Sequence, residues 1–131
     1  MRRFLILIIL LVVNSVYGQR SGETFKLYPN ISIAEMKVLD TISHLYEVKT
    51  RRAFVLNKSK GSRILKPLIY KRPKGDFKYY WVKVVEDNGG NLVTHFNFYV
   101  NEKTFEIRYL DVVNDRELTL SQWRRDKIYG K

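Results

Sequence analysis

The segment from Lys78 to Val113 constrains the fold of this chain more than any other. It reads KYYWVKVVEDNGGNLVTHFNFYVNEKTFEIRYLDVV and contains three runs rich in β-branched and aromatic residues, which favour strands. The turn DNGG at residues 87–90 separates the first two runs, and NEKT at residues 101–104 separates the second from the third. Because such turn residues tolerate the backbone angles of tight hairpins, the segment predicts three successive antiparallel strands.

The alternation of side chains within these strands predicts which face is buried. If the connecting loops contain an even number of residues, odd positions of the first strand share a face with even positions of the second and odd positions of the third. The face expected to form the core is nearly all apolar or aromatic and consists of Tyr79, Trp81, Lys83, Val85, Leu92, Thr94, Phe96, Phe98, Val100, Phe105, Ile107 and Tyr109. The opposite face is mixed and consists of Tyr80, Val82, Val84, Val93, His95, Asn97, Tyr99, Glu106, Arg108, Leu110 and Val112.

One or two helices are expected before the strands. Residues 32–35, Ser-Ile-Ala-Glu, match the capping box, in which serine and glutamate satisfy backbone N–H groups at a helix start. Residues recurring every three or four positions then predict a stripe that docks on the sheet, formed by Ile33, Met36, Leu39, Ile42 (or Ser43) and Tyr46. Residues 47–60 predict a second helix or a bent continuation of the first, although a strand over Ala53–Leu56 also fits the apolar run there.

The remaining segments complete an α+β fold. Residues 64–70 predict a short strand whose Pro67 places it at an edge or a bulge of the sheet. Leu118 and Leu120 suggest a last extended piece, residues 121–124 a terminal turn of helix, and Trp123 a large apolar side chain folded onto the core. We therefore expect an N-terminal helix, or two, packed across a four-stranded antiparallel meander.

The first residues have the pattern of an export signal. Two arginines precede the apolar run Phe4–Val13, and Val16-Tyr17-Gly18 precede an expected cleavage site. A membrane anchor is the alternative, but the run is shorter than the roughly 20 residues that span a bilayer. We expect a signal peptide over residues 1–18, a leader over 19–31 and a single domain over 32–131. The expected location is periplasmic or secreted, and the absence of cysteine favours a bacterial periplasm or envelope and a fold held by packing alone.

The chain is strongly basic, with a formal net charge of +11. An exported basic protein can meet anionic lipid, polysaccharide or an acidic protein, whereas export argues against nucleic acid as a partner. A solvated basic surface is equally compatible, because the lysines and arginines are scattered along the chain. A weaker hypothesis is attachment to an anionic envelope polymer through the cluster Lys58, Lys60, Arg63, Lys66, Lys71, Arg72 and Lys74.

Catalytic and metal-binding motifs are missing from the sequence. There is no cysteine, the two histidines at 44 and 95 have no metal-ligand spacing, and no nucleophile elbow or phosphate-binding loop is present. We therefore expect no catalytic residue, no metal and no cofactor. The alternative is a small hydrolase or isomerase with a cone-shaped α+β pocket, in which His95 is the base and Glu106 the carboxylate that orients it.

Residues 79–115 together with LTLSQWR at residues 118–124 resemble small exported proteins of Gram-negative bacteria that are related in layout to PepSY-like and cystatin-like domains. In that layout a helix lies across an antiparallel meander. The resemblance extends over residues 32–124, and the long basic segment at residues 47–63 departs from it. It implies a non-enzymatic binding or inhibitory module, and it carries no functional residue across because no site motif is shared.

The favoured interpretation is an exported non-enzymatic binding module, inhibitor-like or immunity-like, that contacts another envelope or secreted protein. Tyrosine and arginine are enriched at binding hot spots, and the mixed sheet face presents both types across neighbouring strands. The residues expected to bind the partner are Tyr80, His95, Asn97, Tyr99 and Arg108.

Overall fold

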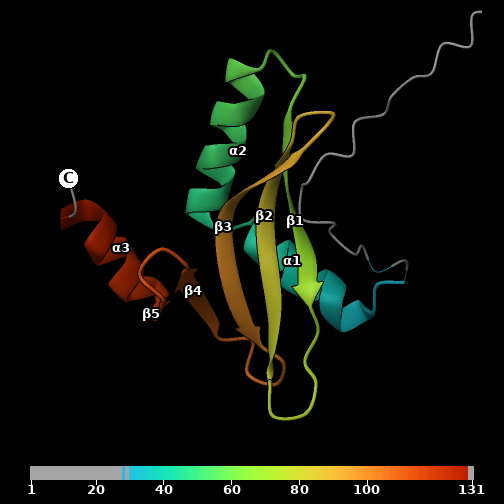
Figure 1. Ribbon diagram of the computed structural model, residues 1–131, viewed down its shortest axis with the longest axis vertical. Helices are drawn as coiled ribbons and strands as arrows, with labels where there is room; N and C mark the ends of the chain where they lie inside the picture. The colour runs from blue at the N-terminus through green and yellow to red at the C-terminus, as the bar shows by residue number, and fades with distance from the viewer. Residues whose placement is uncertain (1–27, 29, 130–131) are drawn as a thin grey trace, which may run out of the picture.

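The computed structural model describes residue 28 and residues 30–129 of the chain. Over these residues it has the α+β architecture that the sequence predicts (Figure 1), with the element order α1 (Ile33–Ser43), α2 (Tyr46–Lys58), β1 (Ile64–Lys71), β2 (Tyr79–Asp87), β3 (Leu92–Asn101), β4 (Ile107–Asp111), β5 (Arg116–Thr119) and α3 (Leu120–Tyr129). The signal peptide predicted over residues 1–18, and most of the leader predicted over 19–31, lie outside the described residues.

The strands form one antiparallel meander in which each strand pairs with the next along the chain. The described sheet has five strands, whereas the sequence predicted four. The additional strand is β5, which pairs with β4 from Arg108↔Thr119 to Asp111↔Arg116. The sequence analysis expected an extended piece at Leu118 and Leu120 but did not count it as a strand of the sheet, because only Leu118 of the four β5 residues is buried and one buried position creates no alternation. β1 lies at an edge of the sheet, as Pro67 predicted.

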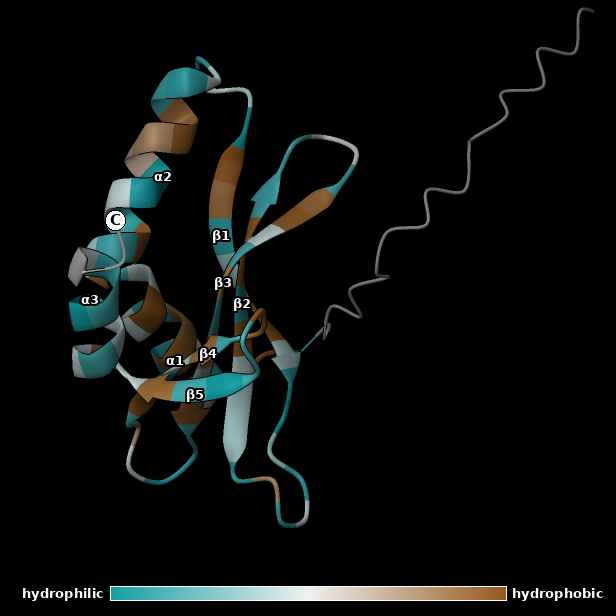
Figure 2. Ribbon diagram, turned by 60° about the vertical axis from the view of Figure 1, so that its left-hand side comes forward, coloured by the Kyte–Doolittle hydropathy of each residue, from teal (hydrophilic) through white to brown (hydrophobic). Residues whose placement is uncertain are grey.

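All three described helices lie on one side of the sheet (Figure 2). We call this side the helix-covered face and the opposite side the helix-free face. Both α1 and α2 contact β1, whereas α3 contacts β4 and β5. The helices therefore cover the two edges of the sheet, β1 on one side and β4 with β5 on the other, and all of them lie on the same face.

The buried stripe of α1 differs from the predicted one. The structure buries Glu35, Val38 and Ile42, whereas Ile33 is 84% exposed and Met36 is 55% exposed. The helix is rotated in this way because the Glu35 carboxylate makes contacts beneath it, described below, that an apolar periodicity does not take into account. The prediction that Ile33 and Met36 dock on the sheet was wrong.

α2 confirms the second helix and excludes the alternative strand over Ala53–Leu56. Its buried side chains are Val48 and Val55, seven residues apart on one side of the helix. Tyr46, predicted to extend the stripe of the first helix, is the first residue of α2 and is 75% exposed. The chain thus turns between α1 and α2 instead of continuing as one helix.

A single apolar core lies between the helices and the sheet. Its buried members are Val38, Ile42, Val48, Leu65, Ile69, Val82, Val84, Phe96, Phe98, Val100, Leu118 and Trp123. Trp123 confirms its predicted packing: its ring stacks on Tyr109 at 4.3 Å and meets Phe96 and Phe98 edge-on at 5.7 Å. The ring attaches α3, ten residues long where the sequence predicted a single turn, to the sheet.

A β-bulge in β3 changes the register of the central hairpin. Val85 pairs with Thr94, but the next residue of β2, Val84, pairs with Phe96. His95 is therefore an extra residue without a partner on β2. Such an insertion shifts every position beyond it by one residue, and a shift of one residue reverses which side chains share a face.

The bulge explains why the predicted core-facing positions were correct for β3 and β4 but mostly wrong for β2. Beyond it, six positions predicted for the core do pack there, namely Phe96, Phe98, Val100, Phe105, Ile107 and Tyr109. Val85 is fully buried, as predicted. The rest of the β2 assignment was wrong: Tyr80, Val82 and Val84 contribute to the core, and Tyr79, Trp81 and Lys83 pair with residues of the helix-free face. The predicted parity holds only between the turn and the bulge, where Asp87 pairs with Leu92 and Val85 with Thr94.

The buried carboxylate of Glu35 connects the start of α1 to Arg72, the residue that follows β1. The capping box is present as predicted, with Glu35 N donating to Ser32 Oγ and Ser32 N donating to Glu35 Oε2. Arg72 also donates to both Glu35 oxygens, with Nη2 3.1 Å from Oε2, and its Nη2 lies 2.7 Å from Asn30 O. Burial acts to raise the pKa of Glu35, but the hydrogen bonds from Arg72 and Ser32 outweigh it and hold this pKa below its usual value.

The substitution Glu35→Gln should lower the free energy of unfolding at about pH 7 by roughly 1.5 kcal/mol, because Arg72 loses charge-assisted hydrogen bonds but is itself partly exposed. The folded-state pKa of Glu35 lies below the unfolded value. The carboxylate's contribution is therefore fully present above the unfolded pKa and is lost as the pH falls through the folded pKa. Urea unfolding should show the difference between the two proteins narrowing at about pH 3.

The matched control is Asp40→Asn, which removes an exposed carboxylate from the same helix. It should change stability little at either pH. A difference between wild type and Glu35→Gln that stays the same at both pH values would contradict the proposed role of the Glu35 charge.

Candidate binding face

Three of the five residues predicted to bind a partner lie together on the helix-free face. The register places Asn97 opposite Lys83 on β2, and Tyr99 opposite both Trp81 on β2 and Arg108 on β4. These side chains alternate with Phe96, Phe98 and Val100, which enter the core on the other side. Asn97, Tyr99 and Arg108 are thus grouped as predicted.

Five aromatic rings form a continuous layer around Tyr99, and we call this layer the aromatic face. Its rings, all half-buried, belong to Tyr70, Phe77, Tyr79, Trp81 and Tyr99. Tyr99 stacks on Tyr79 at 5.6 Å and meets Phe77 at 5.5 Å and Trp81 at 5.6 Å edge-on, and Trp81 meets Tyr70 at 4.8 Å. These separations are those at which ring pairs attract beyond simple burial.

Polar contacts hold this layer in one arrangement. The Trp81 indole Nε1 donates to Asn97 Oδ1 at 3.0 Å, and Asn97 itself is buried. The acceptor therefore sits on a side chain that cannot swing away. Because Trp81 also contacts two other rings, its orientation is set before any partner arrives.

Cations border the rings. Lys71 Nζ lies 4.3 Å from the centre of the Phe77 ring, a cation–π contact. Arg108 Nη2 lies 3.4 Å from Glu106 Oε1, while Arg108 Nε is buried without an acceptor among the residues that the structure describes. A partner can therefore reach the outer nitrogens of this half-exposed guanidinium but not its Nε.

The Tyr99 phenol keeps its proton at neutral pH. Burial raises its pKa, and the negative charges of Glu117 and Asp115 raise it further. The aromatic face therefore presents a neutral hydroxyl group beside the cation of Arg108. This combination can donate hydrogen bonds to carbonyl or carboxylate oxygens of a partner.

Sequence reasoning missed Phe77, Tyr79 and Trp81 as members of this face. Tyr79 and Trp81 had been assigned to the core because the bulge was not recognised. The sequence offered no decisive signal: the predicted core face of β2 included the charged Lys83, the opposite parity includes the charged Glu86, and the structure buries both side chains.

Tyr80 lies on the other side of the sheet, against the apolar core. Burial raises its pKa most, and the nearby charges of Glu35 and Glu102 add to the effect. The side chain is therefore a neighbour of the Glu35–Arg72 contact and belongs to the helix-covered face. Its predicted place beside Asn97 and Tyr99 was wrong, because the bulge reverses which residues of β2 share a face with those of β3.

His95, the bulge residue, contacts a carboxylate that the sequence analysis did not identify. Its Nε2 lies 2.7 Å from Glu86 Oε2, and Arg63 Nη1 lies 2.7 Å from the other oxygen, Glu86 Oε1. The side chain of Glu86 is 10% exposed and that of His95 is 18% exposed. Glu106, expected to orient His95, instead lies beside Arg108. Glu86 thus joins the bulge to the loop between α2 and β1.

The basic cluster considered for polymer binding is partly neutralised. Arg63 contacts Glu86, Lys66 Nζ lies 3.4 Å from Asp87 Oδ2, and Arg72 contacts Glu35. A cation that is already paired with a carboxylate contributes less binding free energy when a polyanion approaches. The cluster therefore offers fewer available charges than the sequence suggests.

Residues 28 and 30–129 contain no group of three or more metal-ligating side chains arranged to hold an ion. Over the same residues, no helix is both long enough and apolar enough to cross a membrane. Comparisons with protein-family models, with curated proteins and with solved structures found no match for the chain.

The substitution Glu86→Gln should destabilise the fold by about 1.5–3 kcal/mol, because a nearly buried carboxylate loses charge-assisted contacts to both His95 and Arg63. Urea unfolding at neutral pH measures the change. Glu106→Gln is the control, since its carboxylate is 54% exposed and makes a longer contact to one arginine. Equal stabilities of the two variants would show that the Glu86 cluster does not hold the bulge in place.

Proposed function

We propose that the protein is an exported, non-enzymatic binding module that contacts another envelope or secreted protein through its aromatic face. The observation that carries the proposal is the continuous layer of five half-buried rings next to Arg108. Tyrosine, tryptophan and arginine are the side chains most enriched at the energetic centres of protein interfaces.

The physical advantage of this face is that its side chains are already ordered. Association is opposed by the entropy lost when mobile side chains are immobilised. Here the rings of Tyr79, Trp81 and Tyr99 restrain one another, and Trp81 is also held by Asn97. A partner therefore gains apolar contact without having to order the surface that it meets.

An inhibitory or immunity-like role is the more specific form of the proposal. Its support is the resemblance of residues 32–124 to PepSY-like and cystatin-like layouts, in which a helix lies across an antiparallel meander. A rigid sheet face with no described helix over it can cover a partner's surface without entering it. The partner would then be a protein whose activity is blocked when this surface is covered.

The enzymatic alternative has one observation in its favour, the 2.7 Å contact between His95 Nε2 and Glu86. A base needs space for a substrate beside it. Four hollows on the described part of the chain are lined by other residues, and His95 lines none of them. The carboxylate is also shared with Arg63, which favours a structural role for the cluster.

Affinity capture tests the proposed face. Purified protein should retain a specific partner from an envelope extract of the source organism, identified by mass spectrometry and then purified for a direct binding measurement. The double substitution Tyr99→Ala with Arg108→Ala should weaken this binding at least a hundredfold, because hot-spot side chains contribute about 2 kcal/mol or more each. Thermal unfolding verifies that the variant remains folded.

The control is Lys49→Ala with Arg125→Ala, which removes two exposed basic side chains from α2 and α3, away from the aromatic face. It should leave the affinity within about threefold of wild type. Unchanged binding of the Tyr99–Arg108 variant would contradict the aromatic face as the contact surface. Loss of binding only in the Lys49–Arg125 variant would assign the contact to the helices instead.

A further inference from the structure

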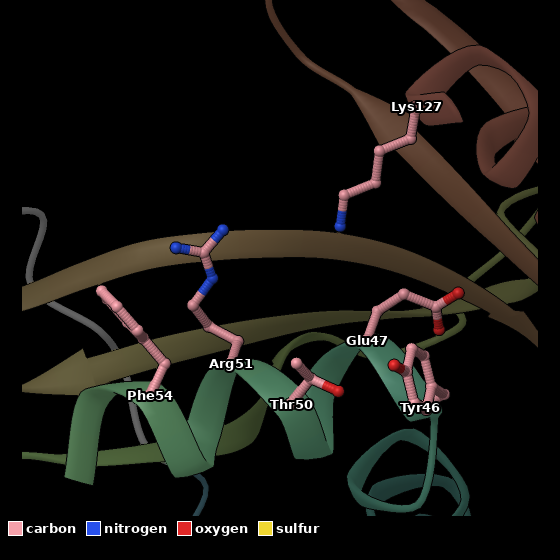
Figure 3. Close-up of a pocket in the computed structure, with 6 residues that line it drawn as sticks. All are labelled: Tyr46, Glu47, Thr50, Arg51, Phe54 and Lys127. Carbon is pink, nitrogen blue, oxygen red and sulfur yellow. The ribbon is translucent and has the colours of Figure 1, made fainter. Parts of the chain in front are cut away.

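A second surface lies between α2 and α3, on the helix-covered side. A hollow of about 260 Å³ is present there. Figure 3 shows its lining, in which five residues come from α2 and Lys127 extends toward them from α3. The α2 residues are Tyr46, Glu47, Thr50, Arg51 and Phe54. We call this hollow the α2–α3 groove.

The α2 wall carries an exposed apolar stripe. Tyr46, Thr50 and Phe54 are spaced four residues apart and therefore follow one another along the same side of the helix. Tyr46 is 75% exposed and Phe54 is 53% exposed. Two large aromatic side chains thus remain in contact with solvent beside a concave surface, where a partner's apolar side chain can cover both.

An ion pair connects the two helices that form the groove. Arg124 of α3 donates to Glu47 of α2 through Nε at 2.6 Å and through Nη2 at 3.2 Å. Burial acts to raise the pKa of Glu47, but the hydrogen bonds from Arg124, together with the charges of Arg124 and Lys127, hold it below its usual value. The acidic group in the lining is therefore ionised and already neutralised.

Both walls are basic. α2 contains four basic residues and one acidic residue, and α3 contains three basic residues and one acidic residue. The two acidic residues are engaged, since Glu47 contacts Arg124 and Asp126 Oδ2 lies 3.2 Å from Arg116 Nη2. The charge that faces an incoming molecule is therefore positive.

Two cations in the lining have no carboxylate within salt-bridge distance among the described residues. Arg51 lies 5.9 Å from the centre of the Phe54 ring, and Lys127 Nζ lies 5.4 Å from that of Trp123. Both therefore keep an aromatic neighbour while their charge remains available. They stand on opposite walls, beside the apolar stripe (Figure 3).

We propose that the α2–α3 groove binds an acidic segment of a partner protein, one that presents an apolar side chain flanked by carboxylates. The apolar side chain packs against Tyr46 and Phe54, and the carboxylates pair with Arg51 and Lys127. This contact is independent of the aromatic face, which lies on the other side of the sheet. The groove recognises charge and one apolar anchor, whereas the aromatic face offers a broad layer of rings.

Concavity distinguishes this surface from a membrane-binding one. An anionic bilayer meets a protein through projecting basic and apolar side chains that enter the headgroup region. Here the aromatic stripe and both cations surround a hollow, and Glu47 with its Arg124 partner is part of the lining. A peptide can place one side chain into such a hollow, which a flat bilayer surface cannot do.

Peptide selection tests the proposal. Random peptides of about twelve residues displayed on phage are selected against the immobilised chain, and the enriched sequences are made synthetically for fluorescence anisotropy. The enriched peptides should carry Asp or Glu on both sides of a Leu, Phe or Trp. Charge reversal at both cations, Arg51→Glu with Lys127→Glu, should weaken their binding at least about tenfold. Phe54→Ala should weaken it less but measurably.

The matched control is Lys49→Glu with Arg125→Glu, which makes the same charge change on the same two helices outside the lining. It should alter the peptide affinity less than about threefold, because it changes only the net charge of the protein and no contact in the groove. Enrichment of peptides without acidic residues, no enrichment over the bare support, or equal effects of the two double variants would overturn the proposal. So would vesicles of phosphatidylglycerol binding through Arg51 and Lys127 while no peptide does.

Discussion

The unpaired residue in β3 determines how the rest of the molecule is arranged. Because His95 has no partner on β2, the side chains of β2 and β3 that face the helices beyond it are Tyr80, Val82, Val84, Phe96, Phe98 and Val100. Without the insertion, aliphatic positions of β2 would face away from the helices and Trp81 would face toward them. The Glu86 carboxylate contacts the same residue, so the bulge is anchored to the loop that follows α2.

The elements of the fold could be predicted from the sequence, because their signals are local. The capping box marked the start of α1, turn residues marked the central hairpins, and Pro67 indicated an edge strand. The side-chain faces could not be predicted as well, since an inserted residue has no local signature. Tyr79 and Trp81 were therefore absent from the predicted binding residues, although Asn97, Tyr99 and Arg108, which lie beyond the bulge, were placed on one face as the register shows.

The same limit applies to the helices. Periodicity identified α1, yet the buried stripe follows Glu35, because this carboxylate contacts Arg72, 37 positions further along the chain. The α2–α3 groove depends on a contact of still longer range, since Glu47 and Arg124 are 77 positions apart. Neither pair can be identified from a single sequence. Each pair becomes visible only in the folded structure, where two elements that are distant in the sequence lie side by side.

Pro67 has a consequence for the association of whole molecules. An edge strand usually offers a row of backbone donors and acceptors to which the strand of another molecule can add, extending the sheet from one copy to the next. Pro67, near the middle of β1, lacks an N–H group, and the exposed Lys66 and Lys71 place positive charge along the same edge. Two copies that approach through β1 would lack the donor of one residue in each strand and would bring their Lys71 side chains toward each other. The edge strand of this cysteine-free chain thus discourages fibrous assembly by its own composition.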